Sequence, residues 1–265
     1  MSTLSRRQLV ASLLVLGTAS LLPGRAEAAD PSPTDPEFAS WLLDRVDDIH
    51  RGGSSHGIMR MNVKTARWER SMKMESWSLG EDYSLVRILE PKKERGTATL
   101  KAKDDLFTYL SKTGRTIKIS GASMGGSWMG SHFTNDDLMK DSRMVNNFDV
   151  EVKNGPTLKG ITTYALILTP KPKAVVVWGR VDVIVRTDNL LPIGQLFYDE
   201  DLAVVRKMEF FDYRQINGQD IPMRVRMSPL DEDQKGEFTE VIYDTIDFGV
   251  DLEPAFFSVN QLKAL

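Results

Sequence analysis

One amphipathic helix is predicted near the beginning of the chain. Apolar side chains recur at helical spacing at Phe38, Trp41, Leu42, Val46 and Ile49. Asp35 stands where a helix cap is expected, Pro36 suits the first helical position, and Gly52 and Gly53 interrupt the pattern. The helix therefore has one apolar stripe with which it can cover another element.

From residue 58 onward the apolar period falls from helical spacing to two. Met59, Met61 and Val63 alternate with polar residues, and Met72 and Met74 share one face of the next segment. Further strand-like segments lie at 84–89, 97–101, 106–110, 116–120, 159–169, 175–186, 195–199, 204–213, 221–227 and 238–246. Their short, turn-rich connections predict an antiparallel meander, because crossover helices would not fit between them.

A second, short helix is predicted at 135–140 after Thr134 as its cap. The count is then eleven or twelve strands with two or three helices. A sheet this large must curl, and its inner face needs a cover, which the early helix can supply. No linker, low-complexity tract or internal repeat divides residues 29–265, so we expect them to form a single domain.

The first 28 residues are predicted to be a cleavable signal peptide. Arg6 and Arg7 precede an apolar run at 9–22, and the small-residue site at 26–28 follows. The run is shorter than the roughly 20 residues of a membrane-spanning helix. The paired arginines resemble a twin-arginine signal, with the general secretory route as the alternative. The chain has no cysteine, so we expect neither disulfides nor a lipid anchor.

Charge and the scattered histidines narrow the possible partners. The chain carries 34 basic and 37 acidic residues, and removal of the leader makes the balance more negative, without a basic block. That argues against nucleic acid or anionic headgroups as main partners. His50, His56 and His132 show no ligand spacing, and the acidic run at 231–233 lacks the pattern of a calcium loop. We expect no metal and no cofactor.

One motif has the form of a catalytic serine site. Residues 121–125 read Gly-Ala-Ser-Met-Gly, which matches a nucleophile elbow centred on Ser123. An elbow needs a helix directly after the serine and a histidine late in the chain. Gly125 and Gly126 interrupt any such helix, and the histidine that follows Ser123 is His132, nine residues on. The sequence therefore gives only weak support to a serine hydrolase.

Methionine and tryptophan gather in the first half of the chain, on alternating strand positions. Such a set suits a flexible acyl-chain pocket, because methionine adapts to irregular partners. The alternative is ordinary core packing. Arg70 shares its strand face with Met72 and Met74. If that face is the inner one, the guanidinium of Arg70 could bind a carbonyl or phosphate group or gate entry to a cavity. If the face is the outer one, Arg70 is simply solvated.

Several segments resemble a known family. Residues 85–91, 95–100, 105–110 and 129–138 (Met-Gly-Ser-His-Phe-Thr-Asn-Asp-Asp-Leu), then 198–227 and 252–259, resemble in order the outer-membrane lipoprotein-sorting proteins of the LolA/LolB-like superfamily. The likeness covers roughly residues 57 to 260. Two departures are His132, where the family usually has aspartate, and the turn at 112–114, which lacks the usual proline.

The resemblance implies an incomplete, half-open β-barrel of about eleven antiparallel strands with helices over its open side. It implies a periplasmic carrier that moves lipoprotein acyl chains or other lipids between membranes or transporter proteins, without catalysis. We expect the protein to be a monomer. The missing cysteine favours a diffusing LolA-like shuttle over an anchored LolB-like receptor. A sensor or adaptor that contacts an inner-membrane transporter is the alternative. The candidate cavity residues are Met59, Met61, Trp68, Arg70, Met72, Met74, Phe107, Tyr109, Trp128 and Met129.

Overall fold

The computed structural model describes residues 30–47, 49, 52–139, 144–174 and 176–264. The predicted signal peptide lies outside these residues. None of the helices in the described part of the chain is long and apolar enough to cross a membrane.

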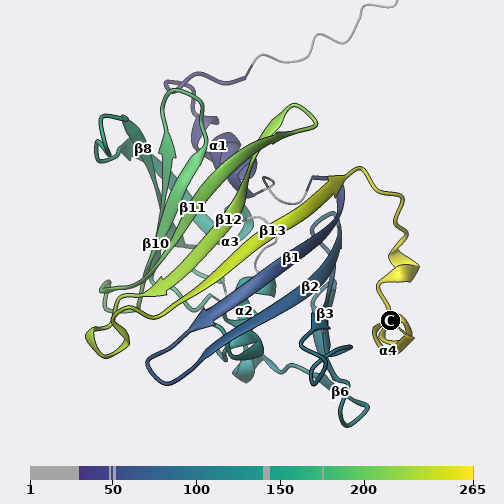
Figure 1. The fold of residues 1–265 in the computed structure, drawn as a ribbon. Coiled ribbons are helices and arrows are strands. Elements are labelled where there is room, and N and C mark those ends of the chain that lie inside the picture. Colours follow the sequence, from purple (N-terminus) through teal and green to yellow (C-terminus); the bar gives the residue numbers. More distant parts are fainter. Residues whose placement is uncertain (1–29, 48, 50–51, 140–143, 175, 265) are drawn as a thin grey trace, which may run out of the picture.

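Thirteen strands in the described residues form one antiparallel sheet (Figure 1). They are β1 (Ser54–Lys64), β2 (Glu69–Leu79), β3 (Tyr83–Glu90), β4 (Ala98–Ala102), β5 (Asp105–Leu110), β6 (Arg115–Lys118), β7 (Phe148–Asn154), β8 (Thr163–Pro170), β9 (Arg180–Arg186), β10 (Pro192–Tyr198), β11 (Val204–Ile216), β12 (Gln219–Pro229) and β13 (Phe238–Phe248). The mainly β, antiparallel prediction is thus confirmed.

The sheet is a meander whose two halves join through the first and last strands. The order is β6-β5-β4-β3-β2-β1-β13-β12-β11-β10-β9-β8-β7, with β1 paired to β13. The edges are β6 and β7, which follow each other in the sequence. The chain between them, residues 119–147, is called here the crossing segment. Because the edges do not pair, the sheet stays open.

The expected count of about eleven strands was wrong. The unpredicted strand is β7, which pairs with β8 along its length. Phe148, Val150 and Val152 alternate there with charged residues, but the stretch follows directly on a helix. The alternating pattern is short, and β7 is an edge strand with a neighbour on one side only. The stretch therefore becomes a strand because it pairs with β8, rather than through its local propensity.

The early helix is confirmed as α1 (Phe38–Asp47). It begins two residues later than expected, and the carboxylate of Asp35 accepts a hydrogen bond from the backbone of Ser32 instead of capping the first turn. The second predicted helix is α2 (Asn135–Met139). The hydroxyl of Thr134 accepts from the Asp137 N–H while the Asp137 carboxylate accepts from the Thr134 N–H, a reciprocal cap.

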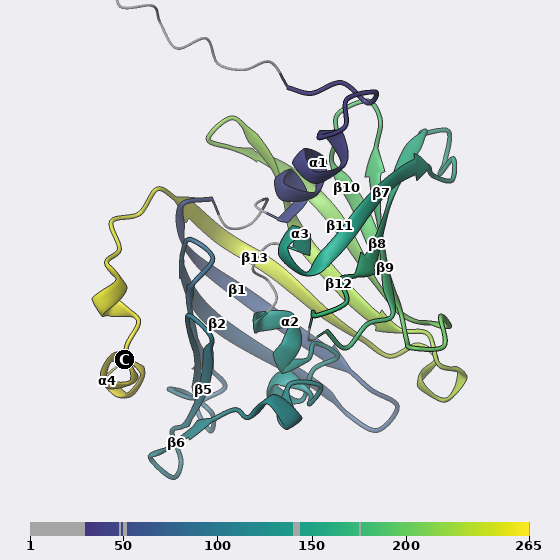
Figure 2. The same ribbon diagram turned by 180° about the vertical axis from the view of Figure 1, so that it is seen from behind.

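Helix α1 covers part of the concave face of the sheet, as expected. Its buried side chains pack against inward residues of β8, β9 and β10: Phe38, Leu42, Leu43 and Val46 against Leu166, Leu168, Val181, Val183, Val185 and Phe197. Figure 2 shows α1, α2 and the short α3 (Met144–Asn147) together on this side of the sheet.

The convex face has a cover of its own near the C-terminus. Helix α4 (Val259–Ala264) lies outside the sheet, on the side opposite α1 (Figure 1). Phe257 and Leu262 form a buried cluster there with Leu85, Ala98 and Leu100 of β3 and β4. The chain thus builds two apolar layers, one on each face of the β1–β5 half.

Candidate functional site

A cavity of about 320 Å³ lies between the concave face and the helices that cover it. We call it the inner cavity. Its apolar lining comprises Val46, Ile49, Met59, Trp77, Val86, Trp128, Phe133, Leu138, Met144, Phe148, Trp178, Val181, Phe197, Met208, Phe210, Val225, Val241, Tyr243 and Ile246. Apolar walls of this extent remove water from a hydrophobic occupant, which is what favours its binding.

A second cavity, of about 510 Å³, lies beside the edge strand β6 and is called here the edge cavity. Its apolar lining comprises Ile88, Leu110, Ile117, Ile119, Trp128 and Met129. Trp128 lines both cavities, so its side chain forms part of the wall between them.

The wall is held by hydrogen bonds within and around the crossing segment. Trp128 is 6% exposed, and its indole N–H donates to the hydroxyl of Thr99 at 3.0 Å. The Ser131 hydroxyl donates to the Trp128 carbonyl at 2.7 Å. Met129, between them, adopts a left-handed backbone with φ of 51°. A non-glycine residue in this conformation is held there by its surroundings.

Arg70 points to the inner side and binds the crossing segment. Its Nη1 donates to the carbonyl of Met129 at 2.9 Å, and its Nη2 forms an ion pair with Glu94. The Arg70 side chain is about a quarter exposed and lines the edge cavity. Arg70 thus lies on the inner face, where its guanidinium holds a backbone carbonyl of the chain itself, and its predicted role in binding a ligand or gating entry stays a prediction.

Most of the methionines that were predicted to line the cavity are packed in the core instead. Met59 lines the inner cavity, whereas Met61, Met72 and Met74 are at most 1% exposed and pack in one buried cluster with Met59 and Ile88. Met59 pairs with Met74 across β1 and β2, as Met61 does with Met72. The alternating pattern correctly marked the inner face, but it did not show which side chains reach the cavity.

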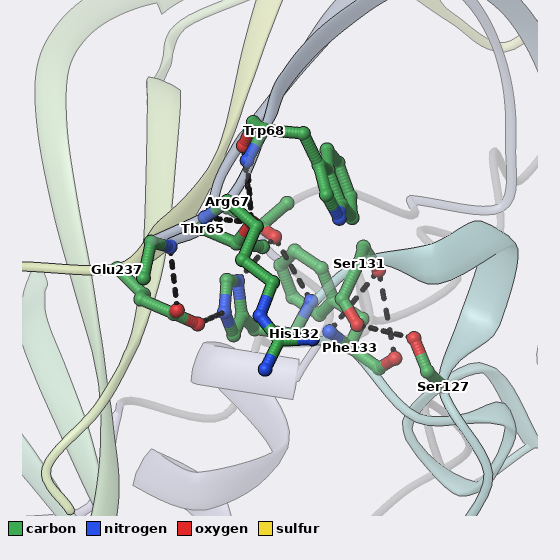
Figure 3. Close-up of polar contacts among 10 residues, drawn as sticks. Thr65, Arg67, Trp68, Ser127, Ser131, His132, Phe133 and Glu237 are labelled. Atoms are coloured by element: carbon green, nitrogen blue, oxygen red, sulfur yellow. Dashed lines mark hydrogen bonds and ion pairs between the residues drawn. The ribbon is translucent and has the colours of Figure 1, made fainter. Parts of the chain in front are cut away.

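Three of the predicted aromatic residues lie away from both cavities. Trp68 sits in the turn between β1 and β2, is 42% exposed, and points away from the neighbouring polar contacts (Figure 3). Phe107 and Tyr109 face the convex side and pack against the cluster under α4. The alternation along β5 allowed either face, and only the C-terminal cover decides between them.

Polar contacts tie the crossing segment to the ends of β1 and β13 (Figure 3). The ring of His132 contacts the Thr239 hydroxyl at 2.9 Å and the Glu237 carboxylate at 3.1 Å. The backbone N–H of Ala66 also donates to Glu237, and together with His132 it holds the pKa of Glu237 below its ordinary value. His132, noted as a departure from the family pattern, therefore serves as an anchor.

A buried ion pair fixes α2 above the inner cavity. Arg206 on β11 is 6% exposed and donates to both carboxylate oxygens of Asp137, at 2.9 and 2.5 Å. Its guanidinium lies 4.0 Å from the ring centre of Trp178 and 4.2 Å from that of Phe197. The sequence analysis missed this arginine, because one charged residue in a strand carries no pattern until its partner is known.

Four serines in the inner cavity were also missed. Ser55, Ser78 and Ser84 are neighbours across β1, β2 and β3, and Ser76 lies next to them on β2. The signal that could have found them is the alternation Ser76-Trp77-Ser78 on the strand that carries Met72 and Met74. The inner face thus passes from methionine pairs to hydroxyls along the same strands.

The serine motif does not form a nucleophile elbow. Ser123 ends a single 3-10 turn, Gly121–Ser123, and its hydroxyl contacts that of Ser120 at 3.2 Å. Its carbonyl accepts from the side chain of Asn135. His132 is engaged by Glu237 and Thr239, and the described chain places no helix directly after the serine. The hydrolase hypothesis therefore has no geometric support.

The structure also places the residues considered for metals. His56 contacts Glu75 at 3.0 Å, and residues 231–233 lie in the exposed turn between β12 and β13. His50 falls outside the described residues. Within the described residues, no group of three histidine or carboxylate side chains could hold a metal ion.

Comparison with solved structures places the fold in a known class. A DUF1329 family protein from Desulfovibrio piger matches 84% of this chain and 97% of its own, at 25% identity and a TM-score of 0.75. A domain assigned to outer membrane lipoprotein sorting from Vibrio parahaemolyticus matches 86% and 100%, at 22% identity and a TM-score of 0.74. A LolA superfamily protein from Nitrosomonas europaea matches 84% and 98%, at 21% and 0.71.

The fold is therefore that of LolA-like lipoprotein-sorting proteins, and the resemblance seen in the sequence is confirmed at that level. A family model described as "Uncharacterized protein" matches residues 80–264, which is more than half of the chain, and the chain belongs to that family. No curated protein matches it.

Proposed function

We propose that this protein is a periplasmic carrier that binds the acyl chains of lipids or lipoproteins in the inner cavity and releases them to a membrane partner, without catalysis. The observation that carries the proposal is the apolar cavity of about 320 Å³ between the concave face and its covering helices. The folds of the lipoprotein-sorting domain and the LolA superfamily protein support the same assignment.

The energetics of such a carrier rest on burial. Each methylene removed from water contributes about 0.8 kcal/mol, so an acyl chain of a dozen carbons gives roughly 10 kcal/mol before ordering costs are subtracted. The net affinity is this gain less the cost of association and of ordering the chain. Release then requires a change in the cavity or a competing partner, since the burial energy opposes simple dissociation.

Arg70 and Trp128 are the residues whose movement would change the cavity and release the acyl chain. The Arg70 guanidinium holds the Met129 carbonyl, and Trp128 next to it separates the inner from the edge cavity. In the proposed cycle, loss of the Arg70 contact frees the crossing segment and joins the two spaces, which admits or releases the chain. A sensor or adaptor role would need no such movable wall.

The variant Arg70→Leu tests this cycle. It should bind a fluorescent fatty-acid probe but release it several-fold faster, because the crossing segment loses a charge-assisted hydrogen bond. Stopped-flow displacement of the probe by unlabelled fatty acid measures the rate. The control is Arg60→Leu, which removes an exposed pair with Asp244 on the outer side of β1. Uptake and release unchanged in Arg70→Leu would remove Arg70 from the mechanism, and a wild-type protein that takes up no probe would contradict the carrier itself.

A further inference from the structure

The lining of the inner cavity changes in polarity along the strands. At one level Met59 and Met74 face each other across β1 and β2, and two residues further along Gly57 faces Ser76. Beyond these, Ser55, Ser78 and Ser84 stand side by side on three strands. The cavity is thus apolar at the methionine level and hydroxyl-lined at the other end, and we call the latter the serine end.

The serine hydroxyls have hydrogen-bonding capacity to spare. Those of Ser55 and Ser78 lie 2.7 Å apart and share one hydrogen bond, which leaves one donor and several acceptor positions between them. Ser55 is 8% exposed, so water has little access to it from outside the cavity. Hydroxyls in an apolar cavity bind a polar group that can both accept and donate, and leaving them unmet costs free energy.

The charged groups around the cavity disfavour an anion. Its lining in the described residues holds three carboxylates, Asp47, Asp136 and Asp137, and no lysine, arginine or histidine. Arg206 lies close by but gives both of its terminal nitrogens to Asp137. Lys101, next to Ser84 on β4, is 5% exposed, already engaged, and absent from the lining. A phosphate or carboxylate head would be buried without a partner and beside negative charge.

Building on the proposed carrier function, we infer that the inner cavity selects amphiphiles with an uncharged, hydroxyl- or carbonyl-bearing head, which binds at the serine end while the acyl chain runs toward Met59 and Trp128. The selectivity is between neutral and anionic lipids of the same chain. It has two sources: hydrogen bonds from the serines attract the neutral head, and the unpaired burial of charge excludes the anion.

A matched pair of ligands tests the inference. The probes are 1-oleoylglycerol and 1-oleoylglycerol 3-phosphate, which share chain and glycerol and differ by one phosphate. Binding is followed by the change in intrinsic tryptophan fluorescence, to which Trp77, Trp128 and Trp178 in the cavity lining contribute, at concentrations below micelle formation. We expect the neutral lipid to bind at least tenfold more tightly. The triple variant Ser55→Ala, Ser78→Ala, Ser84→Ala should weaken its binding by about tenfold, since each lost hydrogen bond is worth about a factor of a few.

The control variant is Ser71→Ala, an exposed serine on the outer side of β2, which should leave both affinities unchanged. Circular dichroism and thermal unfolding establish that the triple variant is folded. Equal binding of the two lipids, or tighter binding of the phosphate, overturns the inference and leaves the carrier proposal intact. Unchanged affinity of the triple variant for the neutral lipid overturns the role of the serines. If neither lipid binds, the carrier proposal fails and the inference fails with it.

Discussion

At the scale of single residues, the inner face holds core positions next to cavity positions, and substitutions distinguish them. Met61 is completely buried in the cluster of β1 and β2 and does not line the inner cavity. Met61→Ala should therefore lower the free energy of unfolding by about 2 to 5 kcal/mol, because it leaves a void in a packed core. Urea denaturation measures the loss.

The same variant should keep lipid affinity within about twofold of the wild-type protein, because the shortened side chain at position 61 does not line the inner cavity. A large loss of affinity with little loss of stability would show that Met61 contacts the ligand. The sequence alone could not distinguish core methionines from cavity-lining ones. Met59 and Met61 share one strand face, and only the position of the crossing segment decides which of them borders the cavity.

At the scale of elements, the strands and the first helix followed from periodicity, whereas the elements that depend on distant partners did not. Residues 58–64 alternate cleanly because one side of β1 is buried and the other is not. The sequence could not show that residues 252–264 return to the convex face, so Phe107 and Tyr109 were assigned to the wrong side. Their burial under α4 satisfies the same alternation.

The C-terminal cover gives a prediction at this scale. Phe257 is 4% exposed and packs with Leu85, Leu100 and Leu262 on the convex face. Phe257→Ala should cost about 3 to 5 kcal/mol of unfolding free energy while leaving lipid affinity unchanged, because the inner cavity is on the other side of the sheet. Thermal unfolding and probe titration measure the two effects. Leu230→Ala, at a side chain 41% exposed, is the control and should change stability little. Loss of lipid affinity in Phe257→Ala would mean that the two faces are coupled.

At the scale of the whole molecule, the open sheet explains how a cavity forms in a chain of this length. The two edges, β6 and β7, are consecutive in the sequence, so the segment that joins them passes across the opening and supplies Trp128, Phe133 and Leu138 to the cavity wall. Arg70, His132 and Arg206 hold that segment at three places. A sheet closed between β6 and β7 would leave no gap for the segment to fill.

Native mass spectrometry of the protein isolated from the cells that produce it is the most direct test of the carrier proposal. We expect the wild-type protein to carry a bound lipid. Val225→Trp, which fills the inner cavity from β12, should carry none, and Thr245→Trp, at an exposed position on β13, should carry the wild-type amount. The carrier proposal is contradicted if the wild-type protein is free of lipid and takes up none when lipid is offered. It is also contradicted if Val225→Trp carries as much lipid as Thr245→Trp.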